Sequence, residues 1–229
     1  MNKFETLQDL CPAGVIGRVQ VVDNFFSSLS EGELNSIRGA HENRMRGFSS
    51  ARKLAKEALM DLGCPVKELT TKQDRTPDWP SQVIGSISHH ENTAGVIVAK
   101  SSTNLLAIGL DLEILQETHS NLPKKVMTKN ELENTRQLSP NFSASCLTTF
   151  CLKEATYKAM WKFNNEGLSF QDIEFSAWNW EEFFGGEIQT PQADILEGIT
   201  ERLPAGVGLR ARVATNGVEV MAVVWACPS

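Results

Sequence analysis

The chain has 229 residues and contains no run of apolar residues long enough to cross a lipid bilayer. A membrane-spanning helix needs about 20 consecutive, mostly apolar residues. The first ten residues, MNKFETLQDL, include acidic side chains and lack the apolar centre of a secretory signal peptide. We therefore expect a protein without a transmembrane segment that works in the cytoplasm.

Paired cysteine motifs are also absent. The five cysteines, Cys11, Cys64, Cys146, Cys151 and Cys227, are odd in number, scattered, and never spaced as Cys-x-x-Cys. A disulfide framework or a zinc cluster would require such pairs. We interpret these side chains as reduced thiols that mostly lie in the core.

A strongly basic surface for nucleic acid is missing, because the net charge is −6. Two local groups of basic residues occur nevertheless. They are Arg44, Arg46, Arg52, Lys53 and Lys56 in the first half of the chain, and Lys124, Lys125 and Lys129 in the second. An acidic protein with local basic sites suits a phosphorylated small molecule or a small acidic partner better than a polynucleotide.

Familiar catalytic and phosphate-binding motifs are absent as well. The chain has no Gly-x-x-x-x-Gly-Lys loop and no Gly-x-Gly-x-x-Gly fingerprint. It also lacks the Gly-x-Ser-x-Gly elbow of serine hydrolases. A nucleotide bound here would be held outside those frameworks.

Two long amphipathic helices are predicted by the apolar periodicity, at about residues 42–62 and 144–162. β-like runs precede and follow each helix, and residues 66–69 predict one further short strand. Ser30 and Thr128 each stand three residues before a glutamate, which predicts two capping boxes. Asn216-Gly217, between the last two β-like runs, predicts a hairpin.

The order of these elements, strand, helix and strands followed by helix and strands again, predicts an α+β fold. We expect two similar lobes that form a pseudo-twofold pair, residues 1–107 and residues 108–229, with the active site between them. No repeat is visible at the level of sequence. The aromatic residues Trp178, Trp180, Phe183 and Phe184 are compatible either with a core or with a partner surface.

The second long helix carries charge where apolar side chains are expected. Leu147, Phe150, Glu154, Lys158 and Trp161 fall at helical spacing and share one face, which we expect to point inward. A carboxylate on such a face is costly unless a cation meets it. Lys158 lies one turn from Glu154 and could pair with it. A metal ion is the alternative, and it would need further carboxylates.

Asp111 and Glu113 supply those carboxylates. Side chains two apart on a strand project from the same face, so the two acids face a common space while Leu110 and Leu112 face the core. With Glu154 they would form an oxygen site suited to Mg²⁺. A solvated strand face is the alternative reading of Asp-x-Glu alone.

Gly85-Ser-Ile-Ser-His89 ends another β-like run. A glycine allows a ligand to approach the backbone closely, and the side chains of Ser88 and His89 can donate hydrogen bonds to phosphate oxygens. Lys153, Lys158 and the arginines of the first helix would add positive charge around such a ligand.

Arg52 falls within the apolar stripe of the first helix. A guanidinium there must find an acceptor, which would be either a buried carboxylate or a ligand phosphate. Arg75, in the loop of residues 73–80, is a further source of positive charge.

These stretches together resemble the phosphopantetheinyl transferases of the Sfp type, and within them the branch of enterobactin synthase component D. The resemblance is carried by Trp79-Pro80 with Gly85-Ser-Ile-Ser-His89, by Gly109-Leu-Asp-Leu-Glu113, by Phe150-Cys-Leu-Lys-Glu-Ala-Thr-Tyr-Lys158, and by the Arg52–Gly63 helix. They span residues 44–162, and their order and spacing are specific in combination.

The resemblance implies transfer of 4'-phosphopantetheine from coenzyme A to a serine of an apo acyl, peptidyl or aryl carrier protein, most plausibly in siderophore or nonribosomal peptide synthesis. It implies the 4'-phosphopantetheinyl transferase fold, with coenzyme A between the lobes. It also implies that Asp111, Glu113 and Glu154 bind Mg²⁺. Glu154 is in addition our candidate for the base that takes the proton of the serine, directly or through a metal-bound water.

Further roles follow from the same resemblance. Lys158 would be catalytic and contact the pyrophosphate, while Ser88 and His89 would contact phosphate. Arg44 or Arg46, together with Arg52 and Arg75, would hold the adenosine-phosphate end. Lys124, Lys125 and Lys129 could steer an acidic carrier, although a solvated helix face explains them equally well.

Two other functions stay open from the residues alone. A magnesium-dependent phosphohydrolase or nuclease would also use carboxylates and lysine, but the acidic net charge weighs against a polynucleotide substrate. A non-catalytic module that binds carrier proteins is the other. We expect a monomer that binds no nucleic acid.

Overall fold

The computed structural model describes residues 3–118, 121–163, 168–176, 178–195 and 203–229. The chain divides into two compact units, Met1–Ser101 and Ser102–Ser229. Within the described residues, no helix is both long enough and apolar enough to cross a membrane.

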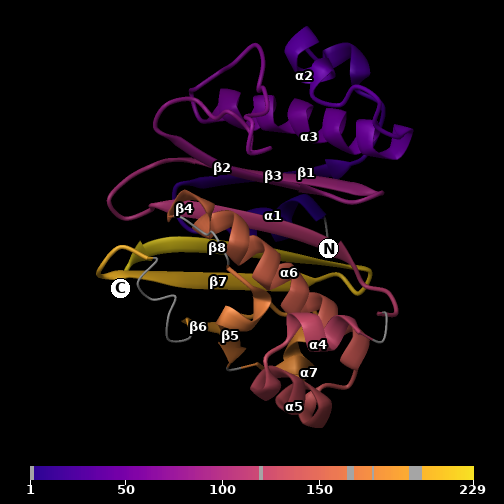
Figure 1. The fold of residues 1–229 in the computed structure, drawn as a ribbon, viewed down its shortest axis with the longest axis vertical. Helices are drawn as coiled ribbons and strands as arrows, with labels where there is room; N and C mark the ends of the chain where they lie inside the picture. Colours follow the sequence, from indigo (N-terminus) through magenta and orange to yellow (C-terminus); the bar gives the residue numbers. More distant parts are fainter. Residues whose placement is uncertain (1–2, 119–120, 164–167, 177, 196–202) are drawn as a thin grey trace. The chain divides into compact units, whose positions relative to one another are not determined.

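The first unit consists of one antiparallel sheet with a long helix across it (Figure 1). Its elements are α1 (Lys3–Leu10), β1 (Val15–Val21), the short 3-10 helix η1 (Phe26–Ser28), α2 (Glu31–Asn35), α3 (Glu42–Asp61), β2 (Val83–His89) and β3 (Thr93–Lys100). The strand order is β1-β3-β2. The core lies between α3 and the sheet, where Leu54 and Leu59 pack with Val96 and Val98.

The second unit repeats this plan and adds a group of shorter elements (Figure 1). Its elements are β4 (Ala107–Ile114), α4 (Leu122–Val126), α5 (Lys129–Leu138), α6 (Phe142–Met160), η2 (Trp161–Phe163), η3 (Phe170–Asp172), β5 (Ile173–Ser176), α7 (Trp180–Phe184), β6 (Gln192–Ile195), β7 (Val207–Thr215) and β8 (Glu219–Pro228). The main sheet has the order β4-β8-β7, and β5 pairs with β6 separately.

The two main sheets share one topology, which confirms the α+β class and the expectation of similar lobes. In each unit a strand is followed by a long helix and then by two paired strands. In each sheet the last strand lies in the centre, antiparallel to both neighbours. The helix α3 covers the first sheet and α6 covers the second. The apolar periodicity therefore located both helices to within about two residues at each end.

The predicted caps and the hairpin are confirmed. Ser30 and Thr128 each accept a hydrogen bond from the backbone N–H of a glutamate whose carboxylate bonds back to the cap. The turn between β7 and β8 passes through Gly217 at φ +85°, a left-handed conformation that glycine adopts without strain.

The short strand predicted at residues 66–69 is wrong. The backbone N–H of Leu69 donates to Glu33 Oε1 at 2.9 Å rather than to a neighbouring strand. Glu33 is fully buried and takes the backbone donor that a strand partner would use. A side chain from a distant helix has thus replaced the strand pairing that local propensity favours.

The aromatic run from Trp178 onward belongs to the core. Trp180 is 3% exposed and Phe183 is fully buried, and both pack with residues of α6 and the main sheet. Trp178 stacks on Trp180 with ring centroids 4.2 Å apart. These contacts answer the question that the sequence left open for Trp180 and Phe183.

Candidate active site

Gly109 brings β4 and α6 into direct backbone contact. A Cβ atom at this position would lie 1.9 Å from the carbonyl oxygen of Ala155 and 2.7 Å from the backbone nitrogen of Ala159. No side chain larger than hydrogen fits there. The close approach allows a lysine one turn beyond Glu154 to reach the strand.

That lysine is Lys158. Its Nζ donates to Asp111 Oδ1 at 2.7 Å and to the backbone carbonyl of Leu110 at 3.0 Å. The side chain of Asp111 is 6% exposed, whereas that of Lys158 is 29% exposed. Lys158 therefore pairs with Asp111 across the helix–strand contact.

Asp111 and Glu113 share one face of β4, as predicted. Their partners in the ladder are Ala222 and Val220, which belong to the apolar core beneath α6. The two carboxylates consequently lie at the edge of a core, and Asp111 is only 4% exposed. The alternative of a solvated strand face is wrong for Asp111.

The prediction that the Glu154 face of α6 points inward needs correction. Glu154 and Lys158 are half-buried and Trp161 is 37% exposed. The inward face instead carries Ala155 and Ala159, which pack on the sheet. Because the helix lies so close to β4, only small side chains fit between them, and the charged positions form a rim.

Electrostatic crowding distinguishes this rim. Burial and the negative charge of Asp111 raise the pKa of Glu113 to about 7, Glu154 adds to the shift, and Lys158 opposes it. The carboxyl groups of Glu113 and Asp111 are close enough to share a hydrogen bond. Burial and Asp111 likewise raise the pKa of Glu154, again against Lys158. Three carboxyl groups thus influence one another around one ammonium.

The donor chemistry of this rim fits a hard divalent cation, which would relieve the repulsion that raises these pKa values. The three carboxyl groups do not yet converge on one position where an ion could bind. Across the described ranges, no three His, Cys, Asp or Glu side chains stand together as a group able to hold a metal ion. Ion binding would require Asp111, Glu113 and Glu154 to turn toward a common centre.

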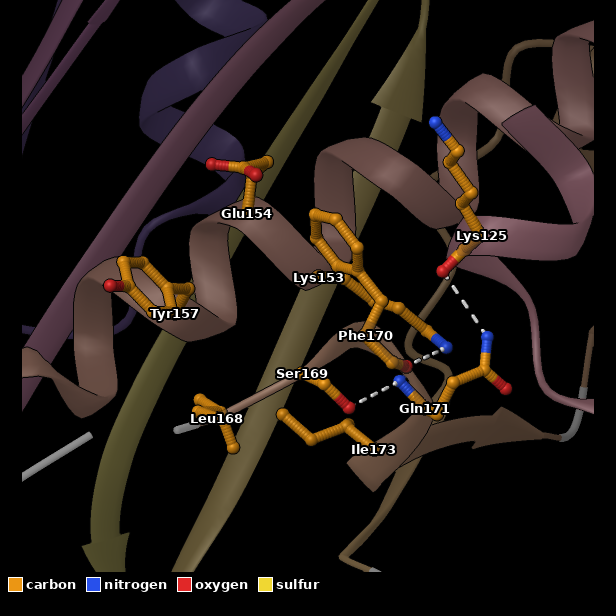
Figure 2. Close-up of a pocket in the computed structure, with 9 residues that line it drawn as sticks. All are labelled: Lys125, Lys153, Glu154, Tyr157, Leu168, Ser169, Phe170, Gln171 and Ile173. Carbon is orange, nitrogen blue, oxygen red and sulfur yellow. Dashed lines mark hydrogen bonds between the residues drawn. The ribbon is translucent and has the colours of Figure 1, made fainter. Parts of the chain in front are cut away.

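A pocket of about 370 Å³ opens beside Glu154 (Figure 2). Glu154 and Tyr157 line it from α6, and Leu168, Phe170 and Ile173 supply an apolar wall from the segment around η3. The remaining lining residues are Lys125, Lys153, Ser169 and Gln171. The pocket therefore combines a carboxylate rim with an apolar interior.

Lys153 does not act as a charge for a ligand, contrary to the sequence-based expectation. Its side chain is 1% exposed. Its Nζ donates to Glu131 Oε2 at 2.6 Å, to the Val126 carbonyl at 2.8 Å and to the Phe170 carbonyl at 2.7 Å. Figure 2 shows Lys153 and Glu154, adjacent in sequence, leaving α6 in different directions. Three acceptors satisfy the three protons of this ammonium.

Ser88 and His89 lie in the first unit and point to opposite faces of β2. Ile87 and His89 share the face that α3 covers, and a Cβ atom on Gly47 would lie 2.5 Å from His89 Nδ1. Ser88 is buried on the other face. The strand therefore does not present both side chains in one direction.

Gly85 does not provide space for a ligand. A Cβ atom there would lie 2.6 Å from the ring of Trp79, so the indole already occupies the space above this glycine. The expectation of a close ligand approach at Gly85 is therefore wrong.

The arginines of the first unit differ in accessibility. Arg44 and Arg75 are exposed and Arg46 is half-buried. Arg52 is 4% exposed, stacks over Phe48 and donates to Thr71 Oγ1 at 3.0 Å. Among the described residues its Nε makes no hydrogen bond. Burial lowers the pKa of Arg52 to about 10, against the attraction of Glu33.

Sequence reasoning missed Glu131, Tyr157, Phe170 and Gln171. Glu131 was recognised only as part of a capping box, yet its carboxylate also accepts from Lys153 and from the backbone N–H of Phe175. Tyr157, one turn after Lys153, could have been found by following the helical period. Phe170 and Gln171 offered no signal, because only tertiary packing brings them to the pocket.

Comparison with known families decides what kind of protein this is. Residues 32–99 match the model of the 4'-phosphopantetheinyl transferase N-terminal domain, and residues 107–199 match that of the 4'-phosphopantetheinyl transferase superfamily. The chain belongs to the 4'-phosphopantetheinyl transferase superfamily. The second match contains Asp111, Glu113, Glu154 and Lys158.

Curated members of the family include several relatives. The chain is 35% identical over 134 residues to 4'-phosphopantetheinyl transferase Npt of Nocardia iowensis, which covers 57% of this chain and 58% of that protein. It is 28% identical to 4'-phosphopantetheinyl transferase PptT of Mycobacterium tuberculosis, over 79% of each chain. It is 32% identical to enterobactin synthase component D of Escherichia coli K12, over 46% of this chain and 48% of that protein.

A solved structure also overlaps with part of the chain. The holo-[acyl-carrier-protein] synthase of Thermotoga maritima matches at a TM-score of 0.43 and 17% identity, over 55% of this chain and 65% of that chain. Overlap at this level adds nothing to the family assignment, which is based on the sequence models and the curated relatives.

Proposed function

We propose that this protein transfers the 4'-phosphopantetheine group of coenzyme A to a serine hydroxyl of an apo carrier protein. The observation that carries the proposal is the Lys158–Asp111 pair, which lies with Glu113 and Glu154 inside the matched family region. The pocket beside Glu154 is the second support. The match spans 58% of the Nocardia enzyme, so its activity comes to this chain as a proposal.

The reaction forms a bond between the serine Oγ and the β-phosphorus of coenzyme A and releases adenosine 3',5'-bisphosphate. Lys158 would move from Asp111 to the pyrophosphate and stabilise the charge that builds up on the leaving group. Glu154, whose pKa is raised by burial and by Asp111, would accept the proton that the serine loses. Its position at the pocket rim suits that role.

Magnesium dependence is part of the proposal. Asp111, Glu113 and Glu154 would hold the ion, and a bound Mg²⁺ would neutralise pyrophosphate charge. The electrostatic influence of Asp111 and Glu154 on Glu113, whose pKa is raised to about 7, supports this assignment.

The coenzyme would be held at several places. The pocket beside Glu154 suits the flexible pantetheine arm, because its wall of Leu168, Phe170 and Ile173 is apolar and a tyrosine lies at its edge. In the first unit, Ser88 and His89 are proposed to contact phosphate. The candidates for the adenosine-phosphate end remain Arg44 or Arg46, Arg52 and Arg75, of which Arg52 would first have to become accessible.

An acidic carrier protein is the proposed partner. Lys124, Lys125 and Lys129 are all exposed and stand near the pocket on α4 and at the start of α5. We propose a carrier of siderophore or nonribosomal peptide synthesis first, and fatty-acid or polyketide carriers second. The likeness to enterobactin synthase component D supports this order.

We also propose that the enzyme works as a monomer in the cytoplasm. All five cysteines are free thiols, and Cys11, Cys146, Cys151 and Cys227 are buried. Cysteines that form no disulfides suit a reducing compartment such as the cytoplasm.

One assay tests the function. The protein is mixed with coenzyme A, Mg²⁺ and an apo carrier, and the intact mass of the carrier is measured. We expect the mass to rise by one phosphopantetheine, the rise to disappear with EDTA, and excess Mg²⁺ to restore it. Unchanged masses across siderophore, fatty-acid and polyketide carriers would contradict the transferase. Full transfer in EDTA would contradict only the metal dependence.

A further inference from the structure

The short helix α4 has its C-terminal carbonyl groups capped by two side chains from other elements. Gln171 Nε2 donates to the carbonyl oxygens of Met127 at 2.9 Å, Lys125 at 3.2 Å and Lys124 at 3.5 Å. Lys153 caps the remaining carbonyl between them. A helix of five residues is not stable alone. These caps therefore help to hold α4 in place, together with the packing of Val126 and Met127 in the core.

The two caps have different surroundings. Lys153 is buried and bound to Glu131, so it belongs to the core. Gln171 is exposed and lies in η3, between the pocket-lining residues Phe170 and Ile173. Its removal would leave the core intact. An effect on activity would then arise from the position of α4 or from the pocket lining, to which Gln171 also belongs.

The backbone of Gln171 is itself held in place. Its N–H donates to Ser169 Oγ at 3.3 Å, and Asp172 Oδ2 accepts from the backbone N–H of Ser169 at 2.6 Å. This capping box fixes η3 at the start of the pocket wall. Gln171 therefore connects the pocket wall formed by η3 to the carbonyl groups at the end of α4.

Lys125 is the residue on which this connection acts. It lines the pocket and its side chain is exposed. Figure 2 shows its carbonyl facing the amide of Gln171 while its ammonium points away from that amide. Gln171 thus holds the backbone of Lys125 and leaves its positive charge available to a partner.

We propose that Gln171 is a positioning residue that holds the cation of Lys125 at the pocket rim, where it meets an acidic group of the carrier protein. The proposal rests on the transferase function and adds a residue that determines carrier recognition. Gln171 lines the pocket but is not among the residues proposed to touch the reacting atoms. Its effect should therefore fall on KM for the carrier and not on kcat.

Gln171→Met tests this, because methionine has a similar length and no N–H donors. We expect KM for an apo carrier to rise about three- to tenfold, and by more than KM for coenzyme A, with kcat within about twofold of wild type. Gln137→Met, at an exposed position on α5, is the matched control and should leave all three constants unchanged. Equal carrier KM values for Gln171→Met and wild type would overturn the proposal.

A double-mutant cycle separates positioning from a general disturbance. In a Lys125→Ala background, Gln171→Met should raise the carrier KM by less than about twofold, because the cation it positions is gone. In a Lys129→Ala background its full effect should persist. An effect of equal size in both backgrounds would refute the link to Lys125. A wild-type protein that transfers nothing would instead refute the function itself, so the two failures differ.

Discussion

Lys158 donates hydrogen bonds both to Asp111 Oδ1, at 2.7 Å, and to the backbone carbonyl of Leu110, at 3.0 Å. One ammonium therefore binds a carboxylate and the strand that carries it. The contact is possible because Gly109 allows α6 to lie against the backbone of β4. A buried carboxylate, a half-buried cation and two further carboxyl groups are held together by this one helix–strand contact.

Replacing Lys158 should remove catalysis without unfolding the protein. We expect Lys158→Ala to lower kcat at least about 100-fold, because the cation that would stabilise charge on the leaving phosphate is lost. The measurement is carrier mass against time. Lys162→Ala is the control, since Lys162 is an exposed lysine one turn later that donates to the Leu106 carbonyl. Comparable losses in the two variants would argue against a specific role for Lys158.

Gly109→Ala should destabilise the protein and disturb the site together. A Cβ atom 1.9 Å from the Ala155 carbonyl forces α6 away from β4, at a cost of about 1–3 kcal/mol or more. Urea unfolding measures the loss. Gly208→Ala on β7 is the control, because the three atoms nearest to its Cβ would all belong to Ser229, with Oγ at 3.2 Å. Similar stability of the two variants would contradict the proposed close contact.

Lys153→Met should cost more stability than any exposed lysine replacement. It leaves the Glu131 carboxylate buried without its cation, and breaking such a pair typically costs about 3–5 kcal/mol. Burial lowers the pKa of Lys153 and raises that of Glu131, while their mutual attraction opposes both shifts. Lys129→Met, at an exposed position, is the control in urea unfolding. A loss below about 1 kcal/mol would show that the pair contributes little.

Glu33 should make the stability of the first unit depend on pH. Burial alone would raise its pKa, but hydrogen bonds from the backbone of Ser30 and Leu69 and from Lys56 outweigh burial and lower it below 4.5. A carboxyl group with a lowered folded-state pKa stabilises the fold above its unfolded pKa. That stabilisation is lost as the pH falls through the folded-state pKa.

Glu33→Gln makes this measurable. At pH 7 we expect the variant to be less stable than wild type by about 1–3 kcal/mol, because charge-assisted hydrogen bonds to buried groups are weakened. The difference should shrink as the pH is lowered from 6 toward 3, in thermal unfolding at each pH. Glu31→Gln, exposed on the same short helix, should show no such convergence. A constant difference at every pH would exclude Glu33 as the titrating group.

Much of the fold could be predicted because its signals are local. Ser30 and Thr128 stand at helix starts, Asn216-Gly217 forms the hairpin turn, and the long helices follow the apolar period. Residues 66–69 were misassigned because Glu33, 36 residues earlier in the chain than Leu69, takes the hydrogen bond that a strand would use. No local pattern reports such a contact.

The sequence by itself determined that Asp111 and Glu113 share a face and that Glu154 and Lys158 share a helical face, since both follow from the fixed periods of strand and helix. Only the tertiary structure decided which cation is available. Lys153 and Lys158 are five residues apart on α6, yet one is sealed against Glu131 and the other lies half-exposed on Asp111. A period sets the angle between two side chains, whereas the direction in which either points depends on what the helix packs against. Here the close contact at Gly109 directs Lys158 toward Asp111, and the Phe170 carbonyl in η3 helps to bury Lys153.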